Sequence, residues 1–534
     1  MFLRPSNLVV LLCAFRCIEG TPVIDLGYAK YQGAVDTSTN LTTFLGIRYA
    51  TAPIGVFSAE VRSINQTELQ FICVISVSYP SDATGVKPAA LLPVIFWIHG
   101  GGYLNGGSYQ YRGTDIINQS NRGVVAVVIQ YRLGVFGFLP GAAVKENGAL
   151  NAGLRDQDFA LRWVNQHISK FGGDPSRVTI WGESAGGGSV LQHIIANNGK
   201  TTPKLFRGAI TSSLFLPSQY NYNDRIPEVS GSSFIAVLAS WRSSYCSVKL
   251  WRRQSMRITI SRYHGNSSLC PSCSAATDAM ACLRSVDASI LETANVAINA
   301  AGFYGTWLLV PVIDGEFITQ RPSLSLAQGK INGDALLSVT NSFEGNRFVN
   351  QSTAATANAT RYALDLWPNF GAEQAAKVGE LYAGLGTQIF QTNAIYGESI
   401  LICPTYYLLQ AFAGRSFKGE FAIPPATHTA DVLYYFPSIS TDLPQVVFPP
   451  VFDNTTFRNA FAQSFTSFAI SLDPNIKVDP TTITPKWSQW ASRHTEMLFN
   501  KTESNTSVVR TEHTSSTLLE RCQFWHSVSA LTSQ

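Results

Sequence analysis

The chain has 534 residues, of which 45% are hydrophobic and 11% aromatic, so it can bury a sizeable core in one large or several smaller domains. Charged residues make up only 14%, the net charge is +4, and the sparse basic residues form no long run, which argues against a nucleic-acid partner. No internal repeat is evident, so the sequence does not favour a repeat architecture.

The N-terminus has the features of a secretory signal. Arg4 supplies a positive charge, residues 8–15 are apolar, and a cleavage point is expected near Gly20. We therefore expect a signal peptide at residues 1–20, a mature domain at 21–534 and a secreted protein; a short hydrophobic anchor is the alternative. Beyond this segment, no run of 18 or more apolar residues predicts a membrane span.

Nine Asn-x-Ser/Thr sequons predict a glycoprotein, although some sequons arise by chance: Asn40, Asn65, Asn118, Asn266, Asn350, Asn358, Asn454, Asn500 and Asn505. Of nine cysteines, Cys13 and Cys17 would leave with the signal. The seven that remain are an odd number, so at least one is free or pairs between chains. Cys270 and Cys273 form a lone Cys-x-x-Cys, which is too little for a metal site.

A buried strand is predicted at Leu92–Ile98, and a glycine-rich loop, His99-Gly100-Gly101-Gly102-Tyr103, follows it. Three glycines after a strand leave backbone N–H groups open to approach. This is how esterases of the HGGG type build an oxyanion hole. An ordinary glycine-rich loop is the alternative.

The next segments alternate between strand and helix. Residues 124–129 are almost wholly aliphatic, which is typical of a central parallel strand covered on both faces. Apolar residues then recur at helical spacing at Leu161, Val164, Ile168 and Phe171, and Gly172–Pro175 end that helix. This alternation predicts the α/β class, with a mostly parallel central β-sheet flanked by helices.

Residues 182–186, Gly-Glu-Ser-Ala-Gly, form a Gly-x-Ser-x-Gly motif between the apolar run 178–181 and a helix-compatible segment. That is the strand–turn–helix context of a nucleophile elbow, in which small neighbours allow a sharp turn that exposes the hydroxyl of Ser184. An ordinary glycine-rich turn is the alternative, so the partners of Ser184 decide between them.

Further strands are predicted at 208–211, 335–339 and 419–423. Glu344 follows the second of these, and His428 is the first histidine after Glu344. The chain order Ser184, Glu344, His428 is that of α/β hydrolases. Among rival acids, we expect Asp431 to brace local backbone and Asp314 to support a turn. We expect His99 to be a structural loop residue, and His494, His513 and His526 to lie at the surface.

These residues resemble the type-B carboxylesterase and cholinesterase family, especially its fungal esterases and lipases. The resemblance covers roughly four fifths of the chain, and several motifs in one order are far more specific than any single one. The matching motifs are residues 44–50, 100–102, 131–134, 151–187, 311–315, 344–345, 428–431, 468–469 with 473–475, and 522–525.

The resemblance implies an α/β-hydrolase fold, carboxylic ester hydrolysis without a cofactor or metal, and a catalytic triad. Ser184 would be the nucleophile, His428 the general base and acid, and Glu344 the orienting carboxylate. It also implies further positions by likeness alone: oxyanion-hole residues Gly101, Gly102 and Ala185, and two disulfides, Cys273 with Cys282 and Cys403 with Cys522.

Two stretches, 57–90 and 229–269, depart from the family pattern. In the first, the family has a longer segment with a disulfide-closed loop, which in lipases forms a lid; only Cys73 is present here, so that disulfide cannot form. Cys73, Cys246 and Cys270 have no family partners. We hypothesise a misjoined exon in the first stretch and a retained intron in the second, with genuine lineage-specific sequence as the alternative.

The sequence thus predicts a secreted, glycosylated serine esterase that forms an acyl-enzyme on a small-molecule or lipid ester. A triglyceride lipase with the same chemistry is one alternative. A non-catalytic, cholinesterase-like binding protein is another, but such relatives lose triad members and here all three residues are present.

Overall fold

A computed structural model describes residues 21–51, 73–228, 273, 277–443 and 449–534, together with the backbone of 247–250 and 258–261. The predicted signal peptide, the sequons at Asn65 and Asn266, and the cysteines Cys246 and Cys270 lie outside the described residues. Most of the stretch 229–269 and the part of 57–90 before residue 73 also lie outside them.

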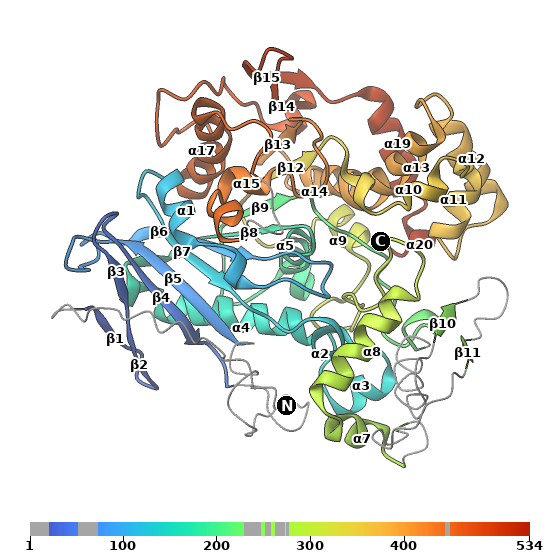
Figure 1. Ribbon diagram of the computed structural model, residues 1–534, viewed down its shortest axis with the longest axis horizontal. Coiled ribbons are helices and arrows are strands. Elements are labelled where there is room, and N and C mark those ends of the chain that lie inside the picture. Colours follow the sequence, from blue (N-terminus) through green and yellow to red (C-terminus); the bar gives the residue numbers. More distant parts are fainter. Residues whose placement is uncertain are drawn as a thin grey trace, which may run out of the picture.

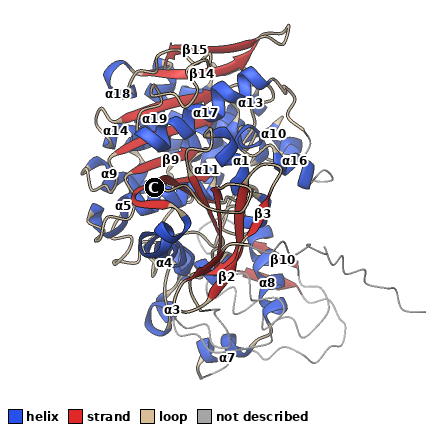
Figure 2. Cartoon of the chain, turned by 90° about the vertical axis from the view of Figure 1, so that its left-hand side faces the viewer, coloured by secondary structure: helices blue, strands red, loops and turns tan. Residues whose placement is uncertain are grey.

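One large twisted sheet of eleven strands runs through the described residues (Figures 1 and 2). Its order is β15-β14-β13-β12-β9-β8-β6-β7-β5-β4-β3. The pairs from β14 to β7 along this order are parallel, and the pairs at both ends are antiparallel. The predicted mostly parallel sheet is therefore confirmed.

The strands of this sheet are β3 (Ala34–Asp36), β4 (Leu41–Arg48), β5 (Val74–Pro80), β6 (Leu92–Ile98), β7 (Val125–Ile129), β8 (Gly173–Glu183), β9 (Gly208–Ser212), β12 (Ala335–Asn341), β13 (Ser416–Phe421), β14 (Thr495–Lys501) and β15 (Ser507–His513). Two short hairpins lie outside it: β1 (Val23–Asp25) with β2 (Lys30–Gln32), and β10 (Ser247–Leu250) with β11 (Ile258–Ser261).

Helices cover both faces of the sheet (Figure 2). The longer ones are α1 (Gly113–Gln119), α4 (Ala152–His167), α5 (Ala185–Ile195), α7 (Ala279–Ser285), α8 (Ala288–Ala300), α11 (Ala359–Leu366), α12 (Ala372–Tyr382), α13 (Gln388–Gly397), α14 (Cys403–Ala411), α17 (Thr455–Ser471) and α19 (Ser516–Ser527). Shorter helical elements are α2 (Gly134–Phe138), α3 (Ala142–Asn147), η3 (Ile168–Phe171), α9 (Pro322–Ala327), η6 (Glu344–Arg347), α10 (Gln351–Ala354), η7 (Glu398–Ile402), α15 (Val432–Tyr435), α16 (Ser438–Asp442), α18 (Trp490–Arg493) and α20 (Ser529–Thr532).

The central strands are buried on both faces, as their continuous apolar runs predict. Alternate residues of β6 pack into two different apolar clusters: Val94 and Phe96 on one face, Ile95 and Trp97 on the other. Because successive side chains of a strand point to opposite faces, this division shows a core on each side of the sheet. The sheet can therefore hold the loops at its strand ends in fixed positions.

The helix predicted from the 161–171 periodicity begins nine residues earlier than the first apolar residue of that pattern. It starts at Ala152, ends at His167 and continues as the tighter turn η3 to Phe171. Gly172 then adopts a left-handed φ of +83°, which ends the helix as glycine readily does. The strand β8 follows directly.

Two disulfides join cysteines of the described chain, Cys273 to Cys282 and Cys403 to Cys522. These are the pairs that the family resemblance implies. Cys73 is buried and free. In the ranges that the structure describes, every helix is too short or too polar to traverse a lipid bilayer.

Candidate active site

Ser184 stands at a sharp turn between β8 and α5. Its backbone has φ 56° and ψ −121°, a conformation that a residue with a β-carbon rarely adopts. The neighbouring glycines allow strand and helix to approach: a β-carbon on Gly186 would lie 2.0 Å from the carbonyl oxygen of Ile98, and one on Gly182 would lie 2.4 Å from the carbonyl carbon of Gly186. The turn has the geometry of a nucleophile elbow.

The structure brings Ser184, His428 and Glu344 together from three separate strand ends. Nε2 of His428 lies 2.8 Å from Oγ of Ser184, and Nδ1 of His428 lies 2.6 Å from Oε2 of Glu344. The other carboxylate oxygen of Glu344 accepts the backbone N–H of Asn341 at 2.7 Å. All three side chains are buried. Glu344 is thus held in place, and it orients the imidazole toward Ser184.

The pKa of His428 reflects two opposing effects. Burial is the largest single influence and lowers it, but the neighbouring carboxylates, Glu344 foremost among them, together outweigh burial, so the pKa lies above its ordinary value. An imidazole in this setting is a stronger base than a free one, and its charged form is stabilised where it would arise during a proton transfer from Ser184.

Glu183, the residue before Ser184, is a fourth ionisable group of the site. Its Oε1 lies 3.4 Å from Nε2 of His428 and has no hydrogen-bond partner among the described residues. Burial raises the pKa of Glu183 to about 8, so it is a neutral acid near pH 7. Glu183 was not predicted from the sequence as a residue of the site. The feature that could have indicated a buried carboxyl is its place at the end of a strand that is buried on both faces, two residues after the buried Trp181.

The expectation for Asp431 is wrong in its detail. Its carboxylate is buried and does not cap α15 or hold local backbone. Instead it accepts Nδ2 of Asn341 at 2.9 Å and the hydroxyl of Tyr435. A buried carboxylate needs hydrogen-bond donors, and the side chain of Asn341, the last residue of β12, supplies one of them. Asp431 therefore links β12 to the segment after His428.

The glycine-rich loop after β6 runs past the turn that holds Ser184. Gly101 and Gly102 have left-handed φ angles of +110° and +64°. Among the described residues, neither amide N–H donates a hydrogen bond within the protein. Ala185 is the first residue of α5, where a helix leaves its N–H groups unpaired. In the part of the chain that the structure describes, these three amides therefore have no acceptor within the protein.

His99 has the structural role that was predicted for it. Its ring is buried, stacks on Tyr131 with centroids 4.5 Å apart, and places Nδ1 2.9 Å from the carbonyl oxygen of Gly100. Burial lowers the pKa of His99 to about 4, so the ring is neutral and carries its proton on Nδ1 when it donates to that carbonyl. His99 thereby braces the start of the glycine-rich loop.

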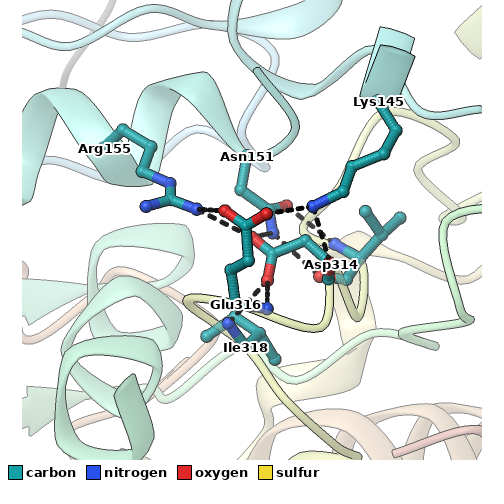
Figure 3. A network of polar contacts seen from close by, with 7 residues as sticks. Lys145, Asn151, Arg155, Asp314, Glu316 and Ile318 are labelled. Carbon is teal, nitrogen blue, oxygen red and sulfur yellow. Dashed lines mark hydrogen bonds and ion pairs between the residues drawn. The ribbon is translucent and has the colours of Figure 1, made fainter. Parts of the chain in front are cut away.

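The turn at Asp314 also matches its prediction. Oδ1 of Asp314 accepts the backbone N–H groups of Glu316 and Ile318, both at 2.9 Å, and Oδ2 accepts Nδ2 of Asn151 at 2.9 Å. Figure 3 shows this network, with Arg155 close to both acids. It fastens the start of α4 to the turn, and it shares no residue with the hydrogen-bonded group of Ser184, His428 and Glu344.

Four other histidines of the described chain form no hydrogen bond with Ser184 or Glu344. His494, His513 and His526 are exposed, as predicted. His193 is buried with Nε2 3.0 Å from Oε1 of Gln157, a structural contact.

A cavity of about 880 Å³ lies beside the site, behind a wall of aromatic side chains. Phe348 packs edge-on against His428 with centroids 4.9 Å apart, and Tyr396 stacks on Phe348 at 5.1 Å. Trp307 packs so closely on Gly102 that a β-carbon there would lie 1.9 Å from the indole nitrogen. Trp307 and Tyr396 also line the cavity, whereas no described lining residue belongs to the hydrogen-bonded group of Ser184, His428 and Glu344.

Three comparisons with known proteins point to the same family. A model of the carboxylesterase family matches residues 74–525. A secreted triacylglycerol lipase of Gibberella zeae is 28% identical over 81% of this chain and 71% of its own length. The carboxylesterase patB of Aspergillus clavatus is 26% identical over 90% of this chain and 93% of its own. The crystal structure of Aspergillus niger EstA aligns with a TM-score of 0.76 and 25% identity, covering 96% of this chain and 99% of that one.

Proposed function

The chain belongs to the carboxylesterase family and is a carboxylic ester hydrolase of the α/β-hydrolase fold, and on this premise we propose that it works through an acyl-enzyme on Ser184. The observation that carries the proposal is the continuous chain of contacts from Ser184 Oγ through His428 to Glu344, at 2.8 and 2.6 Å. A serine hydroxyl is a poor nucleophile until a base of this kind accepts its proton.

In the first half of the proposed reaction, Nε2 of His428 takes the proton of Ser184 as Oγ attacks the carbonyl carbon of the ester. The N–H groups of Gly101, Gly102 and Ala185 donate to the oxyanion that forms. Collapse of this intermediate breaks the bond to the alcohol oxygen, which takes the proton from His428. The alcohol leaves, and the acyl group stays on Ser184.

In the second half, His428 removes a proton from a water molecule, which attacks the acyl carbon. Collapse of the second intermediate returns the proton to Ser184 Oγ and releases the carboxylic acid. Glu344 keeps its negative charge throughout, holds Nδ1–H of His428 and stabilises the imidazolium in both halves. No cofactor or metal enters this scheme.

We favour an esterase of short acyl chains over a triglyceride lipase. The rings of Phe348 and Tyr396 connect His428 to the edge of the large cavity, so a long acyl chain on Ser184 would have to displace this aromatic wall to enter the cavity, whereas a short one would not. A lipase is the second candidate. The cavity itself, which is within the usual range for pockets that take drug-sized ligands, supports it because displacement of the wall would admit a long chain.

We also propose that residues 1–20 are a signal peptide, that residues 21–534 form one hydrolase domain and that the protein is a secreted glycoprotein. The two disulfides and the secreted lipases among its relatives support this compartment. Several sequon asparagines are exposed and open to modification: Asn40, Asn118, Asn350, Asn358 and Asn505. N-terminal sequencing of the secreted protein tests the cleavage of the signal peptide. Endoglycosidase treatment of the same protein tests whether it carries N-linked glycans.

The mechanism is tested by hydrolysis of p-nitrophenyl esters from acetate to palmitate. Wild type should hydrolyse the short esters best, and Ser184→Ala and His428→Gln should each abolish turnover. The control, His513→Gln, changes an exposed histidine and should behave as wild type. A palmitate optimum would favour the lipase, and turnover that survives Ser184→Ala would refute the proposed nucleophile.

A further inference from the structure

The side chain of Gln534 is buried and joins two segments that are far apart in the sequence. Its Nε2 donates to the carbonyl oxygen of Leu216 at 2.7 Å and to that of Ser399 at 2.8 Å. A glutamine amide nitrogen carries two hydrogens, so this one amide satisfies both carbonyls.

The first of these segments follows β9 and touches the site. The backbone N–H of Phe215 lies 3.3 Å from the carbonyl oxygen of Ser184, and the N–H of Leu216 donates to the carbonyl oxygen of Ile400 at 2.9 Å. Phe215 lines the large cavity. Leu216 is therefore held at its N–H by one cavity segment and at its C=O by Gln534.

The second segment is η7 (Glu398–Ile402), a turn of π-helix. Its residue Ile400 also lines the cavity. Single π-helical turns are rare and often occur at functional sites, because the widened turn redirects side chains and carbonyl groups. Here the carbonyl oxygen of Ser399 accepts Gln534, which stabilises the widened turn beside the cavity.

Residues 516–534 also contact this π-helical turn at Glu398 and at the residue that follows the turn, Cys403. Arg521 donates from Nε and Nη2 to the two carboxylate oxygens of Glu398, both at 2.7 Å, and Cys522 is joined to Cys403. In Figure 1, α20 lies beside α9, and Oγ of Ser323 donates to the backbone oxygen of Gln534. The position of Gln534 is thus fixed from several sides.

We propose that Gln534 is a positioning residue that sets the spacing of Phe215 and Ile400, and so the length of acyl chain that the enzyme accepts. Gln534 is not among the described residues that line the cavity, so it acts through the two segments. Phe215 is hydrogen-bonded to the backbone of Ser184, which would carry the acyl group, and Phe215 also lines the cavity. We therefore assign the cavity to the acyl chain of the ester, which enters it past the aromatic wall. This inference rests on the proposed function, and it adds the determinant of chain length.

Gln534→Met tests the proposal because it keeps the size of the side chain and removes both donors. The matched control is Gln523→Met, on the exposed side of α19 in the same segment. We expect Gln534→Met to change KM for p-nitrophenyl octanoate by about fivefold or more, since buried carbonyls without donors shift toward new partners. KM and kcat for p-nitrophenyl acetate should stay within about twofold of wild type.

An equal change for acetate and octanoate, or no change for either, overturns the proposal. If Gln534→Met does not fold, Gln534→Asn is judged by the same octanoate-to-acetate ratio, because it keeps two donors on a side chain too short to reach both carbonyls. Failure of the proposed function gives a different result: wild type hydrolyses neither ester, or hydrolysis survives Ser184→Ala.

Discussion

Oε1 of Glu183 lies 3.4 Å from Nε2 of His428, the same nitrogen that faces Ser184 Oγ. Both side chains are buried, and burial raises the pKa of Glu183 to about 8. Near neutral pH, Glu183 is therefore a neutral acid beside the imidazole. Above about pH 8 it becomes a second negative charge there, in addition to Glu344.

The Glu183 acid should make the folded protein less stable as pH rises. Its folded pKa lies above the ordinary value of a glutamic acid, so the folded state holds its proton more tightly than the unfolded state does. The stability that this gives is complete below pH 4.5 and is lost as pH rises through about 8. The Glu183→Gln variant should not lose stability in this way, because its amide cannot ionise.

Chemical denaturation of wild type and Glu183→Gln between pH 5 and 9 measures the difference. We expect the free energy of unfolding of wild type to fall relative to that of the Gln variant by on the order of a few kcal/mol across this range. Parallel pH curves for the two proteins would show that Glu183 does not titrate with a raised pKa.

Glu344→Gln should move the pH dependence of hydrolysis. The base His428 must be neutral to accept a proton, so activity should rise with pH through its pKa, which Glu344 holds above the ordinary value. Without that carboxylate, the midpoint of the rising limb of kcat/KM moves to lower pH, and kcat falls by about 10²–10⁴-fold.

The pH–rate profiles of wild type and Glu344→Gln check this expectation, with Glu316→Gln as a control that alters an acid of the Asp314 turn. An unchanged midpoint together with near-normal kcat would mean that Glu344 does not orient His428.

Gly102→Ala should impair catalysis more than folding. The φ of +64° disfavours alanine, and its β-carbon would lie 1.9 Å from the indole nitrogen of Trp307, so the loop and its N–H must move. Loss of one oxyanion donor lowers kcat by about 10²–10³-fold. Gly315→Ala is a matched control, because Gly315 has φ +78° with open space around it and lies in the Asp314 turn.

Steady-state kinetics and thermal melting of both variants separate the two effects. Gly315→Ala should melt only about one degree lower with normal kcat, since it meets only backbone strain of about 1 kcal/mol. Equal activity in the two variants would argue that the Gly102 amide does not contact the oxyanion.

The strands and helices that can be predicted from the sequence are those whose apolar and loop-forming residues follow a clear pattern along the chain. The strands β6 and β7 were predicted within one residue because they are continuous apolar runs between loop signals. The order of Ser184, Glu344 and His428 likewise follows from motifs along the chain. Strand β15 was not predicted. Its residues, Ser507–His513, are partly exposed and largely polar, so their pattern does not indicate a buried strand.

The missed features of the site depend on contacts between distant segments. Asn341 and Asp431 are 90 residues apart, and they meet only because β12 and β13 are neighbours in the sheet. The same holds for Gln534, a polar residue that is buried because two distant carbonyls require a donor. A sequence pattern reports the face on which a residue lies, but it does not report which other segment packs against that face.

The most direct test of the account is covalent labelling with a p-nitrophenyl alkylphosphonate, followed by mass spectrometry of the peptides. Oγ of Ser184 should displace p-nitrophenolate at phosphorus and leave a stable adduct, one per protein, on the peptide that contains Ser184. Esterase activity should disappear in proportion to labelling. Loss of activity with Ser184 unmodified, or equal labelling and undiminished hydrolysis in Ser184→Ala, would contradict the central claim that Ser184 carries the acyl group.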